Sequence, residues 1–408
     1  MRYFDIAIIG GGASGLAAAI SACRTNRKAS AAVIERLPKV GKKILATGNG
    51  RCNLSNTDLS PEHYHGTGCT LTEITSVFSV PDFFASLGVI CEDDGYGRIY
   101  PRCRSAASVL DALRLECTRL GITEICNTEI TGIERSESFV LRTVDEDISA
   151  PIVILAGGGR SQSALGSNGS LTEICTQLGI STADAYPALV PLKTDPALVR
   201  PIKGQRADAN VTFFSDGNPV KSERGEVQFT DGLLSGICVF NLSYLCELHD
   251  KNGRKCELTL DLLPEMSLRQ VTELLERTKD IRRTAPAEDY LSGIFTRPMG
   301  VYLLKRTYKR VPEKTADIIG TDRLAVTIKH LSFPVTGTAG FERSQVTKGG
   351  IAAEEINSSL EIERIPGMYV CGEMLDIFGD CGGYNLDFAF SSGAVAGRNA
   401  ALALYKRH

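Results

Sequence analysis

The sequence has no tryptophan, only five histidines, and no pair of cysteines in C-x-x-C spacing. Zinc ribbons, iron–sulfur clusters and disulfide frameworks need closely spaced or patterned cysteines. The 13 scattered cysteines are therefore predicted to be mostly buried free thiols in a reducing cytoplasm. The missing C-x-x-C also argues against a disulfide reductase. His63 and His65 form an isolated H-x-H with no partner nearby in the sequence, so no metal site is predicted.

Long apolar runs are also missing, since none approaches the roughly 18 uninterrupted residues of a membrane-spanning helix. The stretch from Ile6 to Cys23 comes closest, but glycines interrupt it. The formal net charge of −3 gives no electrostatic reason to expect nucleic acid or an anionic membrane as a partner. We therefore expect a cytoplasmic protein that acts on a small molecule, and the sequence carries no signal for an oligomeric state.

Glycine, by contrast, is plentiful, with 40 residues, and the first of them lie in a strongly patterned segment. The apolar run Phe4–Ile9 predicts a buried parallel strand, and an Ala- and Leu-rich helix is expected from Leu16. The glycine motif between them is Gly10-x-Gly12-x-x-Gly15, and Glu35 ends the next predicted strand. This spacing is typical of a βαβ unit that binds the adenosine diphosphate half of a dinucleotide. The helix N-terminus receives the pyrophosphate, and the acid receives the ribose.

Two further strand–glycine segments lie far along the chain. Ala156-Gly157-Gly158 follows a buried strand, and Gly372-Glu373 follows another near the C-terminus. An NAD-dependent dehydrogenase would instead continue directly with more βαβ repeats, whereas residues 128–144 here alternate like a β-hairpin that turns near Ser136-Glu137-Ser138. Because both ends of the chain contribute to one long ligand, the layout predicts FAD. No second G-x-G-x-x-G stands between a strand and a helix, so a dedicated NAD(P)H-binding domain is not predicted.

The middle of the chain has a different pattern of predicted secondary structure. Strand-like runs separated by turns extend from Leu189 to Leu262 and include Ile237–Phe240. A helical stretch is expected from Ser267, which is a candidate N-cap, to about Arg310, and strands are expected to resume between Leu324 and Val335. The predicted fold is α/β: a discontinuous Rossmann-like FAD-binding domain with an inserted β-barrel-like plus helical domain. The expected boundaries are 1–186 and 331–408 for the FAD-binding domain, and 187–330 for the insert.

Two long motifs resemble a known family. The loop Gly41–Asn56, which contains Thr47-Gly48-Asn49-Gly50-Arg51-Cys52-Asn53, is similar to the signature loop of the YhiN/BaiN-like bacterial flavoproteins, some of which are labelled aminoacetone oxidases. The segment Gly372–Gly393 resembles the C-terminal motif of that family, and Val346–Ile351 matches a third block. The resemblance covers most of the chain and implies FAD-dependent electron transfer.

The site residues follow from these patterns and from the resemblance. Short polar and backbone groups of the loop would bind the phosphate–ribityl chain, and the helix beginning near Gly383 would direct its N-terminus at the isoalloxazine. By family analogy alone, Ile130 would touch the adenine. The expected cofactor-binding residues are Gly10, Gly12, Ala13, Ser14, Gly15, Glu35, Arg36, Lys42, Lys43, Thr47, Gly48, Gly50, Arg51, Cys52, Asn53, Ile130, Ala156, Gly157, Gly158, Gly372, Glu373, Gly383, Tyr384, Asn385 and Leu386.

Two positions depart from the family pattern. Asn49 stands where a third glycine is expected, and asparagine tolerates the left-handed conformation well. Asp387 stands where glutamine is expected, which puts a charge in place of a neutral donor.

Several functional alternatives stay open. The expected function is an FAD-dependent oxidoreductase whose reductant is NAD(P)H or the substrate itself. An oxidase of small amines that uses O2, a non-catalytic FAD protein and an RNA-modifying protein are the alternatives. No catalytic acid or base is identified by the sequence.

Overall fold

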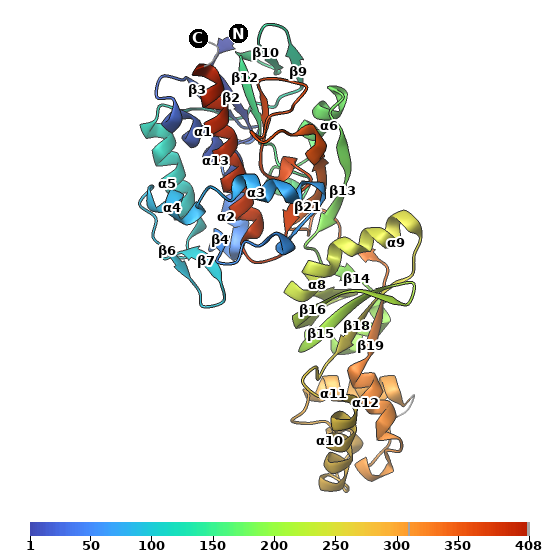
Figure 1. The fold of residues 1–408 in the computed structure, drawn as a ribbon. Helices are drawn as coiled ribbons and strands as arrows, with labels where there is room; N and C mark the ends of the chain where they lie inside the picture. The colour runs from blue at the N-terminus through green and yellow to red at the C-terminus, as the bar shows by residue number, and fades with distance from the viewer. Residues whose placement is uncertain (309–310, 406–408) are drawn as a thin grey trace. The chain divides into compact units, whose positions relative to one another are not determined.

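The computed structural model describes residues 1–308 and 311–405, and its contacts divide the chain into two units (Figure 1). Unit 1 comprises Met1–Pro187 and Gln345–His408, and unit 2 comprises Ala188–Ser344. The chain thus leaves unit 1 once and returns once. The second boundary lies beyond the expected residue 330, because the strand β19 (Leu331–Val335) pairs with β18 (Cys256–Asp261) in unit 2.

A five-stranded sheet in the order β22-β12-β2-β3-β8 forms the centre of unit 1. All of its pairs that the register defines are parallel. Parallel strands covered on both faces read as continuous apolar runs, and every residue of β2, β3, β12 and β22 is buried. The strands are β2 (Ile6–Ile9), β3 (Ala31–Ile34), β8 (Thr123–Ile125), β12 (Ile152–Leu155) and β22 (Met368–Val370).

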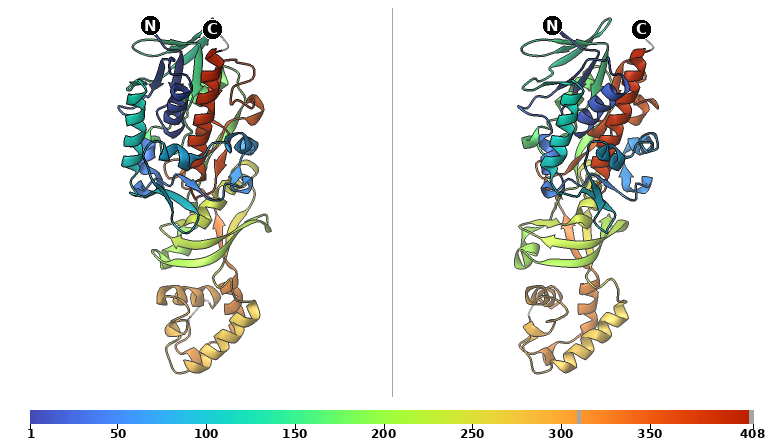
Figure 2. Two further views of the ribbon diagram at one scale, coloured as in Figure 1. Left: turned by 60° about the vertical axis from the view of Figure 1, so that its left-hand side comes forward. Right: turned by 90° about the vertical axis from the view of Figure 1, so that its left-hand side faces the viewer.

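Two helices from opposite ends of the chain lie side by side against this sheet. They are α1 (Ala13–Thr25) and α13 (Tyr384–Tyr405), and Figure 1 and both views of Figure 2 show them together. Their approach is close, because a Cβ added at Gly393 would lie 2.2 Å from the carbonyl oxygen of Ser14. At Gly397 it would lie 2.1 Å from the carbonyl oxygen of Ala18. Glycine is therefore required at this helix–helix contact.

The other elements of unit 1 surround this core. A four-stranded sheet has the order β1-β11-β10-β9, and the expected hairpin is its β9–β10 pair. Smaller sheets are β4-β7-β6, β23-β5 and β13-β21. The elements are β1 (Arg2–Tyr3), α2 (Lys42–Ala46), β4 (Ser55–Asn56), β5 (Tyr64–His65), α3 (Leu71–Thr75), α4 (Val80–Ala85), β6 (Cys91–Asp93), β7 (Arg98–Pro101), α5 (Ala106–Arg119), β9 (Gly132–Arg135), β10 (Phe139–Arg142), β11 (Ile148–Ala150), α6 (Ser170–Gln177), β13 (Thr182–Ala188), β21 (Val346–Ile351) and β23 (Phe378–Gly379).

Unit 2 contains a seven-stranded antiparallel sheet in the order β19-β18-β15-β16-β17-β14-β20. In the described part of the chain its end strands β19 and β20 do not pair, so the sheet is open and not the closed form of a barrel. Alternate residues of β15 are buried, as in a sheet with one covered face. The other strands are β14 (Leu192–Lys193), β15 (Arg206–Ser215), β16 (Asn218–Phe229), β17 (Leu233–Ser235) and β20 (Gly337–Thr338).

Two strand predictions in unit 2 were wrong. Ile237–Phe240 lies in the helix α8 (Ile237–Leu242), since a short apolar run fits a buried helix as well as a strand. Residues from Leu324 lie in α12 (Thr321–Lys329), and the strand starts only at Leu331. The predicted N-cap Ser267 is confirmed by a capping box with Gln270. The remaining helices are α7 (Pro196–Val199), α9 (Glu247–Asn252), α10 (Leu268–Ile281) and α11 (Arg297–Thr307).

The helical stretch was expected to reach Arg310, which is outside the described residues. Among the residues that the structure does describe, no helix is both long enough and apolar enough to span a bilayer.

Candidate functional site

The predicted nucleotide-binding segments meet at the carboxyl edge of the parallel sheet. Ile9 of β2 lies in register with Leu155 of β12 and with Ile34 of β3, and Leu155 is in register with Val370 of β22. The residues that follow these strands therefore share one edge: Gly10, Ala156, Cys371 and Glu35. Ligands of open α/β sheets bind at this edge, outside the carboxyl ends of the strands.

The glycines after β2 divide into two kinds. A Cβ at Gly10 would lie 2.3 Å from the carbonyl oxygen of Ala156, and one at Gly15 would lie 1.9 Å from that of Gly10. These two are needed for packing. A Cβ at Gly12 would meet nothing within 4 Å, and no side chain caps the N-terminus of α1 there. The N-terminus of α1 thus lacks a side-chain cap and has open space at Gly12, as a phosphate site requires.

Glu35 is held in place by the backbone. Its Oε2 accepts a hydrogen bond from the N–H of Gly11 at 2.9 Å, and its Oε1 accepts one from Leu37 at 2.9 Å. Each carboxylate oxygen can accept a further bond, so ribose hydroxyls can still be received. The carbonyl of Glu35 accepts a bond from Thr128, which places the buried Ile130 on the chain segment that follows. Contact of Ile130 with adenine stays a prediction.

The C-terminal segment joins the same edge. Gly372 has φ = 64°, and a Cβ there would lie 2.6 Å from the hydroxyl of Ser14. Glu373 accepts a hydrogen bond from the N–H of Thr347 at 2.7 Å and pairs with Nζ of Lys43 at 3.2 Å. Residues from three distant segments therefore meet here. Thr347 belongs to the third family block, and no single-residue signal in the sequence pointed to it.

A second group of segments meets at the start of α13. The side-chain oxygen of Asn53 is buried and has no hydrogen-bond partner among the described residues. A Cβ at Gly383 would lie 2.9 Å from this oxygen and 2.3 Å from the carbonyl oxygen of Ser55. Asn56 donates a bond to the carbonyl of Gly382 at 2.9 Å. A buried acceptor beside a position that only glycine fits suits an N–H group of an isoalloxazine. The residues present thus fit FAD at both ends.

Asp387, which stands where the family pattern has glutamine, has a side chain that points into the interior. Its carboxylate is buried and accepts a hydrogen bond from the hydroxyl of Ser55 at 2.5 Å. Burial raises the pKa of Asp387 to about 6, and the Ser55 bond opposes part of that rise. The aspartate therefore joins α13 to β4.

The glycine loop itself is mostly exposed. Asn49 has φ = 55°, so the left-handed conformation expected for it is confirmed. Gly50 and Arg51 are exposed, and Arg51 has no ion-pair partner among the described residues. Two of the predicted cations are engaged by backbone carbonyls: Lys42 with Ala164 at 2.8 Å, and Arg36 with Gly166 at 2.9 Å.

Cys52 is fully buried, and burial raises the pKa of its thiol to about 11. A thiol of that kind stays neutral, which favours packing over redox chemistry. Cofactor contacts of the exposed loop residues stay predictions.

The sequence reasoning missed one cluster. His63 and His65, isolated in the sequence, both lie against Asp380, and His63 also lies against Asp58. Ring atoms of His63 and carboxylate atoms of Asp58 and Glu62 fall within 4.8 Å of one another, a set that offers three metal-ligand atoms. The expectation of an isolated H-x-H was therefore wrong. The partner Asp380 stands 315 residues after His65, and only folding reveals it.

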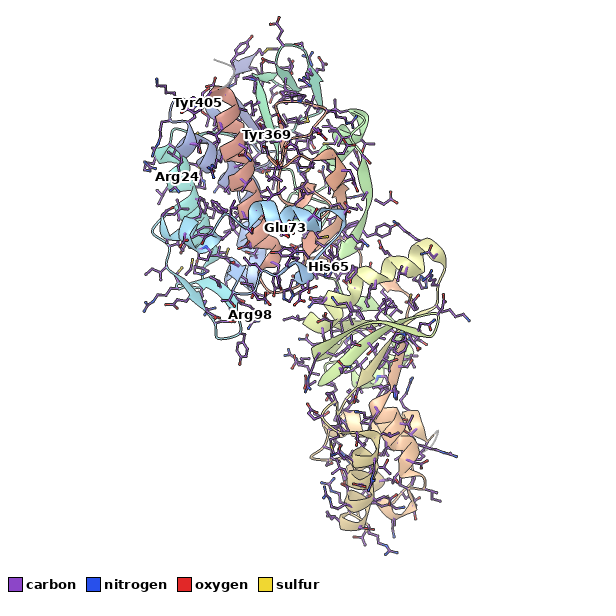
Figure 3. All side chains as sticks on the ribbon, in the orientation of Figure 1. Arg24, His65, Glu73, Arg98, Tyr369 and Tyr405 are labelled. Carbon is purple, nitrogen blue, oxygen red and sulfur yellow. The ribbon has the colours of Figure 1, made fainter. Side chains whose placement is uncertain are left out.

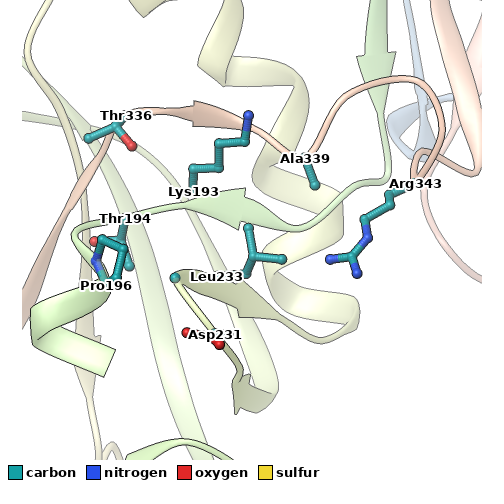
Figure 4. A pocket seen from close by; sticks show the side chains of 9 residues that line it. Lys193, Thr194, Pro196, Asp231, Leu233, Thr336, Ala339 and Arg343 are labelled. Atoms are coloured by element: carbon teal, nitrogen blue, oxygen red, sulfur yellow. The ribbon is translucent and has the colours of Figure 1, made fainter. Parts of the chain in front are cut away.

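Unit 2 has a pocket of its own. Its volume is about 470 Å³, and Figure 4 shows it between β14, β17 and β20. Lys193 and Arg343 line it together with the apolar side chain of Leu233. Neither cation has an ion-pair partner among the described residues. The sequence gave no sign of this pocket.

Comparisons with known proteins agree with these features. A family model described as the HI0933-like protein Rossmann domain matches residues 4–399. The chain is 35% identical over 404 residues to the 3-dehydro-bile acid delta(4,6)-reductase of Clostridium scindens, and this alignment covers 97% of this chain and 98% of that protein. It is 27% identical over 411 residues to the ribosomal RNA dihydrouridine synthase of Haemophilus influenzae, and this alignment covers 96% of this chain and 97% of that protein.

The solved structures bear on the fold alone. The 3-ketosteroid-delta4-(5alpha)-dehydrogenase of Rhodococcus jostii, in complex with 4-androstene-3,17-dione, aligns with a TM-score of 0.50 and 15% sequence identity. The alignment covers 98% of this chain and 97% of that one. The predicted Rossmann-like α/β fold is thereby confirmed.

Proposed function

Because the chain belongs to the HI0933-like family of Rossmann-domain flavoproteins and is an FAD-dependent oxidoreductase, we propose that it reduces a carbon–carbon double bond conjugated to a carbonyl group. The YhiN/BaiN-like resemblance seen in the sequence is the same family. Bound FAD supplies hydride transfer to or from an organic substrate. The single structural observation that supports the flavin in this proposal is the two-ended cradle. It has open space at Gly12 before α1 and, beside Gly383, the side-chain oxygen of Asn53, which has no hydrogen-bond partner among the described residues.

The activities for which the relatives are named support this bond type. A 3-dehydro-bile acid delta(4,6)-reductase acts on double bonds in conjugation with a 3-keto group. A dihydrouridine synthase reduces the uracil double bond, which is conjugated to a ring carbonyl. The two names differ in substrate and agree in chemistry. We extend only that shared chemistry to this chain.

In the proposed enzyme each end of the cradle has its own task. The N-terminus of α1 and Glu35 bind the adenosine diphosphate half. Lys43 and Glu373 hold the middle of the cofactor between the loop and the C-terminal segment. The N-terminus of α13, at Gly383 and Tyr384, lies where negative charge on the reduced ring would be stabilised. The protein thus binds, orients and electrostatically supports the flavin.

The electron donor that we propose is NAD(P)H, bound transiently. A reductase must regain two electrons per turnover, and the sequence offers no second strand–glycine–helix motif for a permanently bound nicotinamide. The rival reading is an oxidase of small amines, in which the substrate supplies the electrons and O2 removes them. The location that we propose is the cytoplasm, because all 13 cysteines are free thiols.

A small enone is the substrate class that we favour, since the 35% identical relative is named for one. Ribosomal RNA is a second candidate with an observation of its own. Residues 267–330 contain 13 Lys and Arg against 8 Asp and Glu, although the whole chain is net acidic. Several of these cations are exposed: Arg277, Arg283, Lys305, Lys314 and Arg323. A basic surface of this kind is what binding to phosphates requires.

The test uses purified, flavin-loaded protein under anaerobic conditions. NADPH and NADH are expected to bleach the flavin, and a 3-keto-4-ene steroid is expected to restore its colour with one double bond reduced per flavin. Bleaching by amines instead of by NAD(P)H would establish the oxidase reading. A preparation that takes up no FAD would contradict the proposed function.

The RNA candidate has a separate test. Binding of a ribosomal RNA transcript should weaken steeply with salt and should fall in an Arg277→Glu, Arg283→Glu double variant. Turnover of the steroid by that variant at the wild-type rate, with RNA binding unchanged, would dismiss the RNA candidate.

A further inference from the structure

The pocket of unit 2 is a cavity whose ligand neither the sequence motifs nor the related proteins identify. Its volume of about 470 Å³ lies in the range of small-molecule sites, which is about 300–1,000 Å³. All of its lining residues belong to unit 2. Lys193 lies shortly after the chain enters this unit, and Arg343 lies shortly before the chain leaves it. The fold therefore brings two distant segments together around one cavity.

Backbone hydrogen bonds fix the walls of the pocket. β14 pairs with β17 on one side and with β20 on the other, so that Lys193 stands opposite both Leu233 and Gly337. The N–H of Thr194 donates to the carbonyl of Gly232 at 3.0 Å, which joins β14 to the turn before β17. Paired strands hold a binding site more firmly than a free loop does.

Positive charge gathers at this pocket. Figure 4 shows Lys193 extending from β14 and Arg343 extending from the segment that follows β20. Neither side chain has an ion-pair partner among the described residues. The acid in the described lining is Asp231, and Nζ of Lys203 donates to it at 3.0 Å and lowers its pKa. Since Lys203 neutralises this acid, two cations remain available for a ligand.

Arg98 of unit 1, labelled in Figure 3, shows how an arginine is usually engaged. Its guanidinium pairs with Asp94 at 2.7 Å and lies over the ring of Tyr96, 5.7 Å from the centroid. Arg343 has neither kind of partner among the described residues. A guanidinium that borders a cavity can bind a carboxylate or a phosphate through two parallel hydrogen bonds.

The lining also has an apolar part. Pro196, Leu233 and Ala339 contribute to it, and Leu233 stands opposite Lys193 in the β14–β17 pair. An inorganic ion would leave these side chains uncovered. Covering apolar surface contributes about 25 cal/mol per Å², so a ligand with an apolar body gains from the same pocket.

We propose that this pocket binds an organic oxyanion, which is a carboxylate or a phosphate carried on an apolar body. Arg343 binds two oxygen atoms of the head group, Lys193 supplies the second positive charge, and Leu233 contacts the apolar body. The inference goes beyond the proposed function, because it concerns a ligand of unit 2 and does not depend on the bond that the flavin reduces.

The test uses three probes that share one naphthalene body: 2-naphthoate, 2-naphthyl phosphate and the neutral 2-naphthamide. Each is titrated calorimetrically into the flavin-loaded full chain at low ionic strength. At least one of the anions is expected to bind tenfold or more tightly than the amide, and the tighter anion assigns the head group. Raising the ionic strength to about 0.3 M should weaken the anions and leave the amide unchanged.

Variants locate the binding site. Arg343→Gln and Lys193→Gln should each weaken binding of the anion about threefold or more, and the double variant about tenfold or more. Binding of the amide should change by less than twofold. Arg98→Gln is the matched control, because it removes an arginine that already pairs with an acid, and it should leave all three probes within twofold. Equal urea midpoints in all variants show that the fold is intact.

Three results would overturn the inference. Equal affinity for the amide and the anions would show that the pocket does not select for charge. Unchanged anion binding in the double variant would place the anion elsewhere on the protein. Absence of binding of either anion at about 5 mM would show that the two cations do not form a site.

Discussion

Unit 1 and unit 2 differ in net charge and in the kind of internal packing that stabilises each of them. Unit 1 carries 22 Lys and Arg against 28 Asp and Glu, whereas unit 2 carries 23 against 20. Of the 40 glycines, 29 belong to unit 1. Unit 1 brings backbone close to backbone and leaves space for a ligand, whereas unit 2 is built around large side chains such as Phe229 and Phe333. An average over the chain conceals both differences.

The largest expected effect concerns the glycines of unit 1. Gly15→Ala should destabilise the protein by more than about 4 kcal/mol, because its Cβ would lie 1.9 Å from a backbone oxygen that cannot move aside. Urea unfolding followed by circular dichroism measures this. The matched control in unit 2 is Gly253→Ala, where a Cβ meets nothing within 4 Å. It should lose only about 1–2 kcal/mol, from its left-handed conformation. Equal losses would contradict the contrast between the units.

The next effect concerns the side-chain core of unit 2. Phe333→Ala should lower the free energy of unfolding by about 3–5 kcal/mol, because the fully buried ring contacts Phe229 at a centroid distance of 5.8 Å. Ile281→Ala, at a side chain that is mostly exposed, should change it by less than about 0.5 kcal/mol. Both variants should retain their FAD absorbance in native buffer. Loss of FAD in Phe333→Ala alone would show that unit 2 is needed for the cofactor.

The buried acid of unit 1 should make stability depend on pH. Asp387 has a pKa of about 6 in the folded protein, above the ordinary value of about 3.9 that it takes when unfolded. The penalty for ionising it is full above pH 6 and is relieved as the pH falls from 6 toward 4. Asp387→Asn should therefore stabilise the protein by up to about 3 kcal/mol at pH 7.5 and by almost nothing at pH 4. Thermal melts at the two pH values measure the difference. A pH-independent gain would contradict the buried charge.

The smallest effect concerns the open space before α1. Gly12→Ala should leave the unfolding free energy nearly unchanged, since its Cβ meets no protein atom. It should weaken FAD binding at least tenfold, equivalent to about 1.4 kcal/mol, because the methyl group occupies the place of the phosphate. Isothermal titration of the apoprotein with FAD measures the affinity. An unchanged affinity would place the pyrophosphate elsewhere.

Local patterns in the sequence were informative wherever one short segment decides the structure. The βαβ unit from Ile6 to Glu35, the hairpin that contains Ser136 and the capped helix at Ser267 were all predicted and are confirmed. Predictions failed where the segment is short and apolar, as at Ile237–Phe240. A helix and a strand bury such a run equally well, so its tertiary contacts determine which of the two forms. The sequence likewise could not show that β19 completes the sheet of unit 2.

The family and the βαβ unit with its glycine motif could be predicted from the sequence alone, and nucleotide binding by that unit stays a prediction. The spaced glycines and the acidic residue after β3 lie within about 30 residues of one another, so this motif can be recognised from the sequence without a structure. Other contacts depend on folding. Folding pairs Lys43 with Glu373 and brings Asp380 to His63 and His65. It also leaves the side-chain oxygen of Asn53 with no hydrogen-bond partner among the described residues. The physical reason is sequence separation: these side chains interact only once α13 packs on α1 and β23 pairs with β5, and no local pattern records that event.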